Sequence, residues 1–280
     1  MDADGVTFQS HIDGSRHRLT PARSIEIQAD CIGADISMQL DECTDYPCAY
    51  EEAARSMELS LAWGAASKQA FSDHIERTAH PERRQALFGI VQGSNYEDLR
   101  RQSAEAVVAQ GYDGYALGGL AVGEGHDQMC ASIDMAAPFL PEEKPRYVMG
   151  IGKPIDLIEA VARGIDMFDC VLPTRSGRHG QAWTWAGPIN LRNARFAEDT
   201  SPLEPDIACP ASQEYSKAYL HHLLKAGEFL GPMLLSWHNT AFFQALMARM
   251  RRAIEAGTFD AFHGHYAQKW AATRSESKTG

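Results

Sequence analysis

A short apolar run that ends in a carboxylate decides the fold class of this chain: Met167-Phe168-Asp169-Cys170-Val171-Leu172-Pro173-Thr174-Arg175-Ser176-Gly177-Arg178. The run predicts a strand, and the residues after it predict a loop that carries two arginines. An aspartate at the end of a buried strand is costly unless it is hydrogen-bonded or takes part in chemistry. Arginines beside it suit a substrate that carries phosphate. The alternative is an aspartate that caps the next turn, with Arg175 and Arg178 in solvent.

The composition bounds the class of protein. At 280 residues the chain is long enough for one large core, or for one core with a small appendage. Its hydrophobic content is ordinary for a soluble protein, and no apolar run reaches the ~18 residues of a membrane span. The net charge of -11 argues against a general nucleic-acid binder but is compatible with a narrow basic patch. The start shows no secretory signal and the six cysteines form no CxxC pair, so we expect a cytoplasmic protein with reduced thiols.

Short apolar runs alternate with amphipathic stretches over most of the chain. The runs predict strands over Ala34–Leu40, Leu87–Gln92, Gly114–Leu120, Arg146–Ile151, Met167–Val171 and Pro188–Leu191. The stretches between them predict helices over Tyr50–Ile75, Tyr96–Gln110, His126–Phe139 and Ile155–Arg163. This alternation is typical of βαβ units with a parallel sheet, so we expect an α/β protein. Two further helices, Gln213–Lys225 and Thr240–Ala256, predict a C-terminal helical appendage.

Polar or small residues follow five of the predicted strands at the point where each strand ends. They are Asp41, Gln92, Gly118-Gly119, Met149-Gly150 and Asp169. In a (β/α) barrel the carboxyl ends of the strands carry the active site. Loops are often polar, but five such positions in succession favour one shared site. A TIM barrel has eight strands, however, and only five or six are visible before residue 195.

Several segments, taken in order, resemble the tRNA-guanine transglycosylases, the base-exchange enzymes of queuosine biosynthesis. They are Asp13–His17 through Ser24–Gln28, Asp41–Thr44, Phe88–Gly93, Gly118–Glu124, Met149–Pro154 and the segment around Asp169. The resemblance implies a TIM (β/α)8-type barrel that lacks its first strands, followed by a helical region that carries the family's zinc subdomain. We therefore expect a partial barrel over residues 1–200, the former zinc-binding region over 201–272 and a disordered tail over 273–280.

The resemblance also implies a reaction, in which the wobble guanine of a tRNA anticodon loop is exchanged for a 7-deazaguanine base, preQ1 in bacteria. Asp169 is then the nucleophile, and its carboxylate forms a covalent bond to the ribose. No redox cofactor is needed. Bacterial members of the family are typically homodimers, so the resemblance implies tRNA, the base and a second copy of the chain as partners, and no membrane.

The same resemblance assigns residues to the base and to the RNA. The base-binding residues are Asp41, Gln92, Gly118, Gly119, Leu120 and Met149. A carboxylate accepts from the N–H groups of a guanine-like edge, and Met149 offers an apolar face for stacking. The RNA-binding residues are Gly150, Ile151, Gly152, Lys153, Pro154, Ile155, Asp156, Thr174, Arg175, Ser176, Gly177 and Arg178. In isolation, Asp41 as a helix cap, Gln92 as a loop amide and Met149 as core filler are the alternatives.

Two parts of the family's chemistry are missing from these residues. The family's general acid/base is an aspartate in an Asp-Ser-Gly-Gly-Phe-Gln segment, which does not occur in the 280 residues. Such a group typically contributes ~10²–10⁴-fold. The family's zinc ligands are three cysteines and a histidine, and the corresponding positions are Ile207, Cys209, Ser212 and His238. Structural zinc is almost always four-coordinate, so we expect weak zinc binding or none.

Other interpretations stay open. Asp206 and His221 are alternative zinc ligands. The chain is alternatively an impaired or inactive member of the family that still binds tRNA or the base. A third interpretation, a sugar-phosphate enzyme on a TIM barrel, is permitted by the fold alone.

Overall fold

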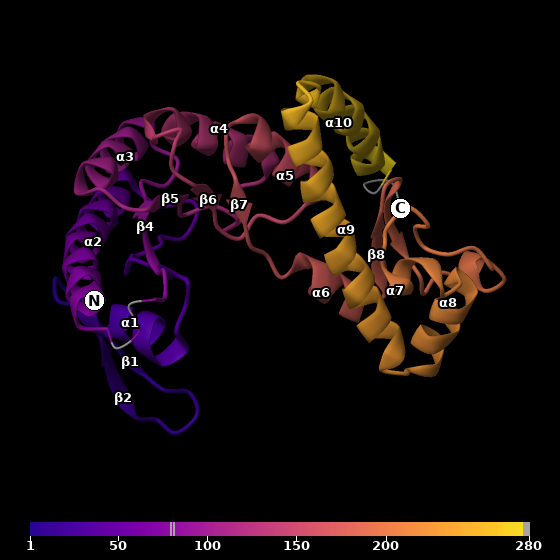
Figure 1. Ribbon diagram of the computed structural model, residues 1–280, viewed down its shortest axis with the longest axis horizontal. Helices are drawn as coiled ribbons and strands as arrows, with labels where there is room; N and C mark the ends of the chain where they lie inside the picture. The colour runs from indigo at the N-terminus through magenta and orange to yellow at the C-terminus, as the bar shows by residue number, and fades with distance from the viewer. Residues whose placement is uncertain (79, 81, 277–280) are drawn as a thin grey trace. The chain divides into compact units, whose positions relative to one another are not determined.

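The computed structural model describes residues 1–78, 80 and 82–276, except for the side chains of residues 268 and 271–276. The chain forms two compact units (Figure 1). Unit 1 consists of Met1–Ile151 and Arg163–Asp169, and unit 2 consists of Gly152–Ala162 and the chain from Cys170 onward. The functional division at residue 200 stays a prediction, because compactness alone does not test it.

Unit 1 is an α/β unit. Its strands are β1 (Val6–Gln9), β2 (Arg16–Leu19), β3 (Ile36–Met38), β4 (Ala86–Val91), β5 (Gly114–Leu117), β6 (Arg146–Val148) and β7 (Met167–Phe168). Its helices are α1 (Pro21–Glu26), the π-helical η1 (Ile27–Ile32), α2 (Tyr50–Arg77), α3 (Glu97–Gln110), α4 (His126–Ala136) and the 3-10 helix η2 (Ala137–Phe139). Strands β3 to β7 form one parallel sheet in chain order. The predicted fold class, α/β with a parallel sheet, is confirmed.

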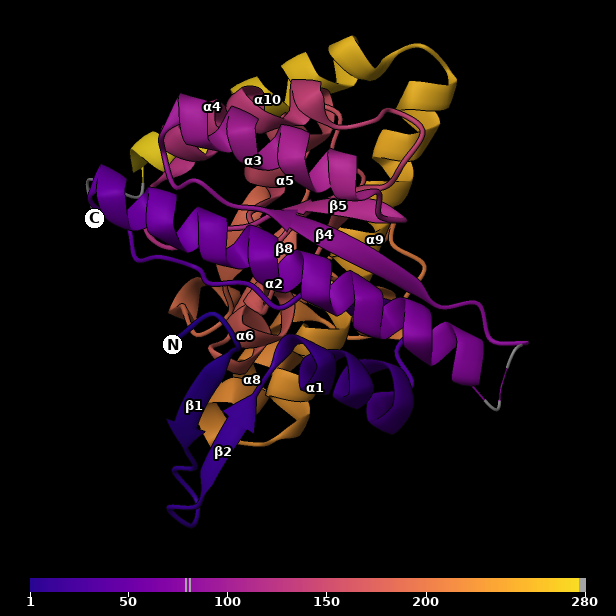
Figure 2. The ribbon, with the colours of Figure 1, turned by 90° about the vertical axis from the view of Figure 1, so that its left-hand side faces the viewer.

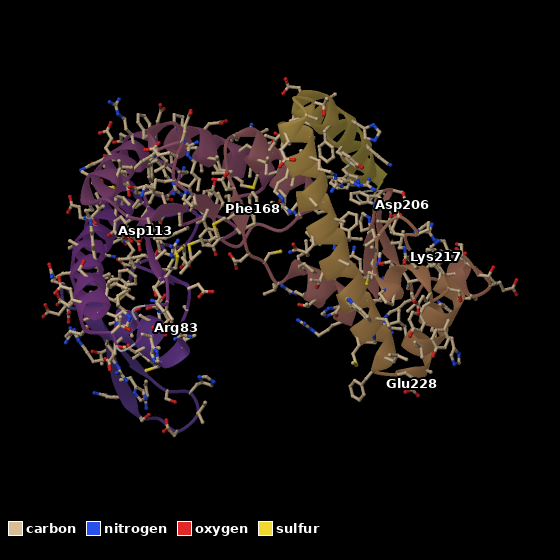
Figure 3. All side chains as sticks on the ribbon, in the orientation of Figure 1. Arg83, Asp113, Phe168, Asp206, Lys217 and Glu228 are labelled. Carbon is tan, nitrogen blue, oxygen red and sulfur yellow. The ribbon has the colours of Figure 1, made fainter. Side chains whose placement is uncertain are left out.

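Helices α2 and α3 lie against this sheet, as Figure 2 shows for the part around β4 and β5. All four residues of β5 are buried, which explains its continuous apolar run. Aspartates that precede two strands fix the pairing of the strands. Asp113 accepts a hydrogen bond of 2.9 Å from the Leu87 N–H (Figure 3), and Asp166 accepts one of 2.9 Å from the Arg146 N–H.

The first residues form elements that the sequence pattern does not predict. Strands β1 and β2 pair as an antiparallel hairpin, and α1 follows directly. No residue of either strand is buried. Val6 and Phe8 alternate with Thr7 and Gln9 in β1, but β2 has a single apolar residue, Leu19, so the pattern covers only one strand of the hairpin.

Unit 2 is mostly helical. Its helices are α5 (Pro154–Ala162), α6 (Leu172–Arg178), the 3-10 helix η3 (Ala194–Phe196), α7 (Pro210–Gln213), α8 (Lys217–Ala226), α9 (Leu230–Glu255) and α10 (Phe259–Glu276). Its strands β8 (Gln181–Thr184) and β9 (Gly187–Asn190) form an antiparallel hairpin, so the predicted strand Pro188–Leu191 lies outside the parallel sheet. Helix α10 includes residues 273–276 of the expected disordered tail, and 277–280 lie outside the described residues.

The core of unit 2 is aromatic. The rings of Trp185 and Phe242 lie 4.7 Å apart, and those of Tyr266 and Trp270 lie 5.1 Å apart. The guanidinium of Arg249 lies 3.6 Å from the centre of the Trp185 ring, which is a cation–π contact.

The loop predicted over Thr174–Arg178 is wrong, because these residues belong to α6. Pro173 stands at the start of this helix, where a proline is well tolerated. Ser176 and Gly177 are buried, and α6 packs against α9. A Cβ at Gly177 would come within 2.6 Å of the Ser236 backbone nitrogen, so glycine permits this close approach. Tertiary packing thus stabilises a short helix that its own sequence does not predict.

Candidate functional site

The five positions predicted at strand ends lie at one edge of the parallel sheet. Asp41, Gln92, Gly118, Met149 and Asp169 follow the carboxyl ends of β3, β4, β5, β6 and β7, respectively. Figure 3 marks Phe168, the last residue of β7, immediately before Asp169. Because these parallel strands are neighbours, their carboxyl ends meet at the same edge, and all five positions belong to unit 1. This predicted placement is confirmed.

Asp41 and Gln92 contact each other directly. The Gln92 Nε2 donates a hydrogen bond of 2.6 Å to Oδ2 of Asp41. Gln92 is only 3% exposed, and its backbone N–H donates to Ser103 Oγ at 3.0 Å. Burial raises the pKa of the Asp41 carboxyl, although the bond from Gln92 opposes this shift. The pair presents a carboxylate acceptor and an amide at a fixed position, which suits an edge that carries N–H groups.

Two glycines bring the backbone after β5 close to this pair. A Cβ at Gly118 would collide with the side-chain amide of Gln92. Gly119 has φ +67°, in the left-handed region that favours glycine. Burial and the charge of Asp41 raise the pKa of the nearby Cys43 thiol, and the Gly119 backbone opposes this shift. The next residue, Leu120, is buried.

Asp169 is exposed, and one of its oxygens is held in place. The Tyr147 hydroxyl donates to Oδ1 at 2.6 Å, and the Gly150 N–H donates to the same oxygen at 3.0 Å. Burial and the bond to Asp169 raise the pKa of Tyr147. The hydroxyl therefore stays protonated at neutral pH and donates this hydrogen bond. Met149, between the two donors, is half-buried. A Cβ at Gly150 would lie 3.2 Å from that of Ala121, which places Asp169 near the loop after β5.

The residues predicted to bind RNA differ in their exposure. Lys153, Arg175 and Arg178 are exposed, as a role with phosphates requires. Ser176 and Gly177 are buried against α9. Gly152 is buried as well, and a Cβ there would collide with the Cys170 thiol. Thr174 is exposed as well, so an RNA could reach the three cations and this hydroxyl.

Two of the four positions of the family's zinc ligands are occupied by a hydrogen-bonded pair, Ser212 and His238. His238 is buried, its Nε2 lies 2.8 Å from the Trp183 carbonyl oxygen, and its Nδ1 lies 2.8 Å from Ser212 Oγ. Because a carbonyl only accepts, Nε2 carries the proton, and the Ser212 hydroxyl donates to Nδ1. Both ring nitrogens are thus engaged. Burial lowers the pKa of His238 to about 4, so the ring is neutral at pH 7.

The residues present do not fit a closed zinc site. Ile207 has no ligand atom and is 3% exposed, so it fills space beside the buried Cys209. The alternative ligand His221 uses its Nδ1 on the Leu191 carbonyl oxygen at 2.7 Å. Within the described residues, no three His, Cys, Asp or Glu side chains are grouped to hold a metal ion.

Comparison with known proteins identifies the family. The model of the queuine tRNA-ribosyltransferase family matches residues 1–272. The chain belongs to this family. A queuine tRNA-ribosyltransferase of Caulobacter vibrioides is 62% identical over 269 residues, which cover 96% of this chain and 70% of that protein. The protein of the same name from Zymomonas mobilis is 54% identical over 272 residues, or 97% of this chain and 69% of that protein.

Two residues near the site are not predicted from the sequence. Tyr147 lies two residues before Met149. Side chains two residues apart in a strand lie on the same face, so this spacing indicates that Tyr147 lies on the same side as Met149. Arg100 in α3 shares a helix face with the buried Ser103, Ala104 and Val107, since these positions are three, four and seven residues away.

No helix among the described residues is long and apolar enough to cross a membrane.

Proposed function

We propose that this chain exchanges the wobble guanine of tRNA for a 7-deazaguanine base. The matched family is named queuine tRNA-ribosyltransferase, and the two relatives described are 62% and 54% identical to this chain. One observation supports the assignment of the site: the hydrogen-bonded Asp41–Gln92 pair and the exposed carboxylate of Asp169 follow strands of one parallel sheet. Asp41 accepts from the N1–H and amino group of the base, and the Gly119 N–H donates to its exocyclic oxygen.

Asp169 is the proposed nucleophile. Its Oδ1 holds two hydrogen bonds, so Oδ2 attacks the anomeric carbon of the ribose. The bond from this carbon to N9 breaks, and guanine leaves with the electron pair and takes up a proton from water. The incoming base gives its N9 proton to water, attacks the same carbon and displaces the carboxylate. The RNA backbone stays intact, and each half of the exchange breaks one bond and forms one.

The proposal extends to the RNA contacts, the complete fold, the compartment, the oligomeric state and the preferred base. Lys153, Arg175 and Arg178 contact phosphates of the anticodon loop, whose target base leaves its stack to reach the site. The parallel sheet is part of a TIM-type barrel, and the enzyme acts in the cytoplasm, as a homodimer of the kind that bacterial members form. preQ1 is the preferred 7-deazaguanine.

The direct test is the exchange of labelled guanine into tRNA. We expect the chain to incorporate label into a tRNA with guanine at the wobble position, and not into the same tRNA with adenine there. Equal labelling of both tRNAs contradicts the proposed site of reaction. No labelling of either, with a folded protein, contradicts the activity.

One observation favours an alternative, an impaired or inactive member of the family that still binds tRNA or the base. The 280 residues contain no Asp-Ser-Gly-Gly-Phe-Gln segment, the source of the family's general acid/base. The exchange rate of this chain is then ~10²–10⁴-fold below that of an enzyme with such a group. Binding of the wobble-guanine tRNA without any labelling supports this alternative, and the absence of RNA binding contradicts it.

The contacts at the positions of the family's zinc ligands support the proposal that this chain folds without zinc. Purified chain is expected to contain zinc well below one equivalent, and a chelator is expected to leave its melting temperature unchanged. The double substitution Ile207→Cys with Ser212→Cys supplies the two absent ligands, and it should bring zinc to one equivalent with thiolate–metal absorption on titration with cobalt. A melting temperature of the unsubstituted chain that falls with chelator contradicts the proposal.

A further inference from the structure

Arg100 is the most unusual charged residue in the described part of the chain. It lies in α3, has an exposed fraction of 0%, and forms no ion pair with any described residue. A buried cation without a carboxylate partner is costly unless all of its donors are used. Burial lowers the pKa of its guanidinium to about 10, so the group still carries its charge at neutral pH.

All the donors of Arg100 that are used go to backbone carbonyl oxygens at the carboxyl ends of two strands, β4 and β5. Its Nε donates to Ser94 at 2.6 Å, and its Nη1 donates to Gly118 at 2.8 Å. Two longer contacts reach Val91 at 3.3 Å and Gly119 at 3.5 Å. The guanidinium therefore links the loop after β4 to the loop after β5. These are the loops that carry Gln92 and the two glycines of the site.

The bond to Gly118 fixes a direction as well as a position. In a trans peptide the C=O of one residue and the N–H of the next point in opposite directions. Because Arg100 holds the Gly118 carbonyl oxygen on the core side, the Gly119 N–H points the other way. A Cβ at Gly119 would lie 3.0 Å from Gln92 Oε1, so this peptide borders the hydrogen-bonded pair of Asp41 and Gln92.

We propose that Arg100 is a positioning residue for base recognition: it holds the Gly118–Gly119 peptide so that the Gly119 N–H donates to the exocyclic oxygen of the bound guanine-like base. This inference rests on the proposed function, which supplies the base. Arg100 itself does not touch the base. Its effect is passed through one peptide group, whose alternative orientation would present a carbonyl oxygen to another oxygen and repel it.

The test compares two bases that differ at the atom concerned. 6-Thioguanine keeps the N1–H and the amino group that Asp41 reads, but its sulfur is a weak acceptor in place of the exocyclic oxygen. Affinities of the purified chain for guanine and for 6-thioguanine are measured by equilibrium dialysis, for the unsubstituted chain, Arg100→Met and Arg100→Lys. The matched control is Arg101→Met, the same change at the next residue, which is exposed and paired with Glu105.

We expect the unsubstituted chain and Arg101→Met to prefer guanine by about tenfold, the effect of one hydrogen bond. Arg100→Met should lose guanine affinity by a similar factor and bind 6-thioguanine as before, so that the preference disappears. Arg100→Lys, whose ammonium can still reach the carbonyl oxygens, should restore part of it. If Arg100→Met fails to fold, Arg100→Lys alone must show a reduced preference.

A purely structural role for Arg100 predicts a different pattern. Arg100→Met and Arg100→Lys would then melt at a lower temperature but keep the full preference for guanine, and this result overturns the inference. Weak binding of guanine by the unsubstituted chain, or binding without preference, overturns the inference together with the proposed base site. The two failures are distinguishable, because only the second appears before any residue is substituted.

Discussion

Asp169→Asn should lower the rate of guanine exchange by at least about 10³-fold, because a neutral amide is a poor nucleophile toward the anomeric carbon. The substitution changes little else. Asn has nearly the same shape, and its Oδ1 can accept the bonds that Tyr147 and Gly150 donate to Asp169. Exchange of labelled guanine into tRNA measures the effect, and thermal melting should show no loss of stability.

Asp166→Asn is the matched control for this experiment. Asp166 is an exposed aspartate at the other end of β7, and it also accepts a backbone hydrogen bond, from Arg146. The control should retain the exchange rate of the unsubstituted chain. An exchange rate that survives in Asp169→Asn contradicts the assignment of the nucleophile, whereas a loss in both variants points to a damaged fold.

Asp41→Asn is the second large effect, and it should act in opposite directions on binding and on stability. The amide keeps one acceptor for Gln92 but loses the charge-assisted bonds to the base, so guanine affinity should fall about 10–100-fold. Burial raises the folded pKa of Asp41 above its ordinary value. The stability contributed by the protonated carboxyl is present below the ordinary pKa and is lost as pH rises through the folded pKa. At pH 7 the base-free chain therefore carries a penalty that the neutral amide removes.

Urea unfolding and guanine binding, measured as functions of pH, check both arms of this prediction. In the unsubstituted chain, guanine affinity should fall on acidification through the raised pKa of Asp41. In Asp41→Asn this pH dependence should disappear, and the free energy of unfolding at pH 7 should rise. A variant with unchanged guanine affinity contradicts the role of Asp41, and a less stable one contradicts the account of its burial.

Elements with a clear apolar pattern, and polar residues at the ends of strands, could be predicted from the sequence. The apolar run within Gly114–Leu120 predicts a strand, and β5 is buried along its whole length. Glycine follows where the chain must approach Gln92. Asp41 and Asp169 follow the ends of strands, and the parallel order of the sheet then places them at one edge.

The rest depends on tertiary contacts that no local pattern encodes. Helix α6 exists because Gly177 lets it pack closely against α9, and its own seven residues, with a proline and a glycine, predict a loop. The role of Arg100 is not predicted from the sequence, since the carbonyl oxygens that bind it come from two separate loops. At the zinc positions the sequence shows that two ligands are gone. It does not show that Ser212 and His238 bond to each other.

The central claim is that Asp169 forms a covalent bond to tRNA. The most direct measurement is to incubate the chain with wobble-guanine tRNA, denature the mixture, separate it on a denaturing gel and locate any RNA-linked peptide by mass spectrometry. We expect a protein band shifted by one tRNA, with the ribose attached to Asp169, that is absent in Asp169→Asn and disappears when excess guanine is added before denaturation. An adduct on another residue, or exchange of guanine with no adduct at all, would contradict the account.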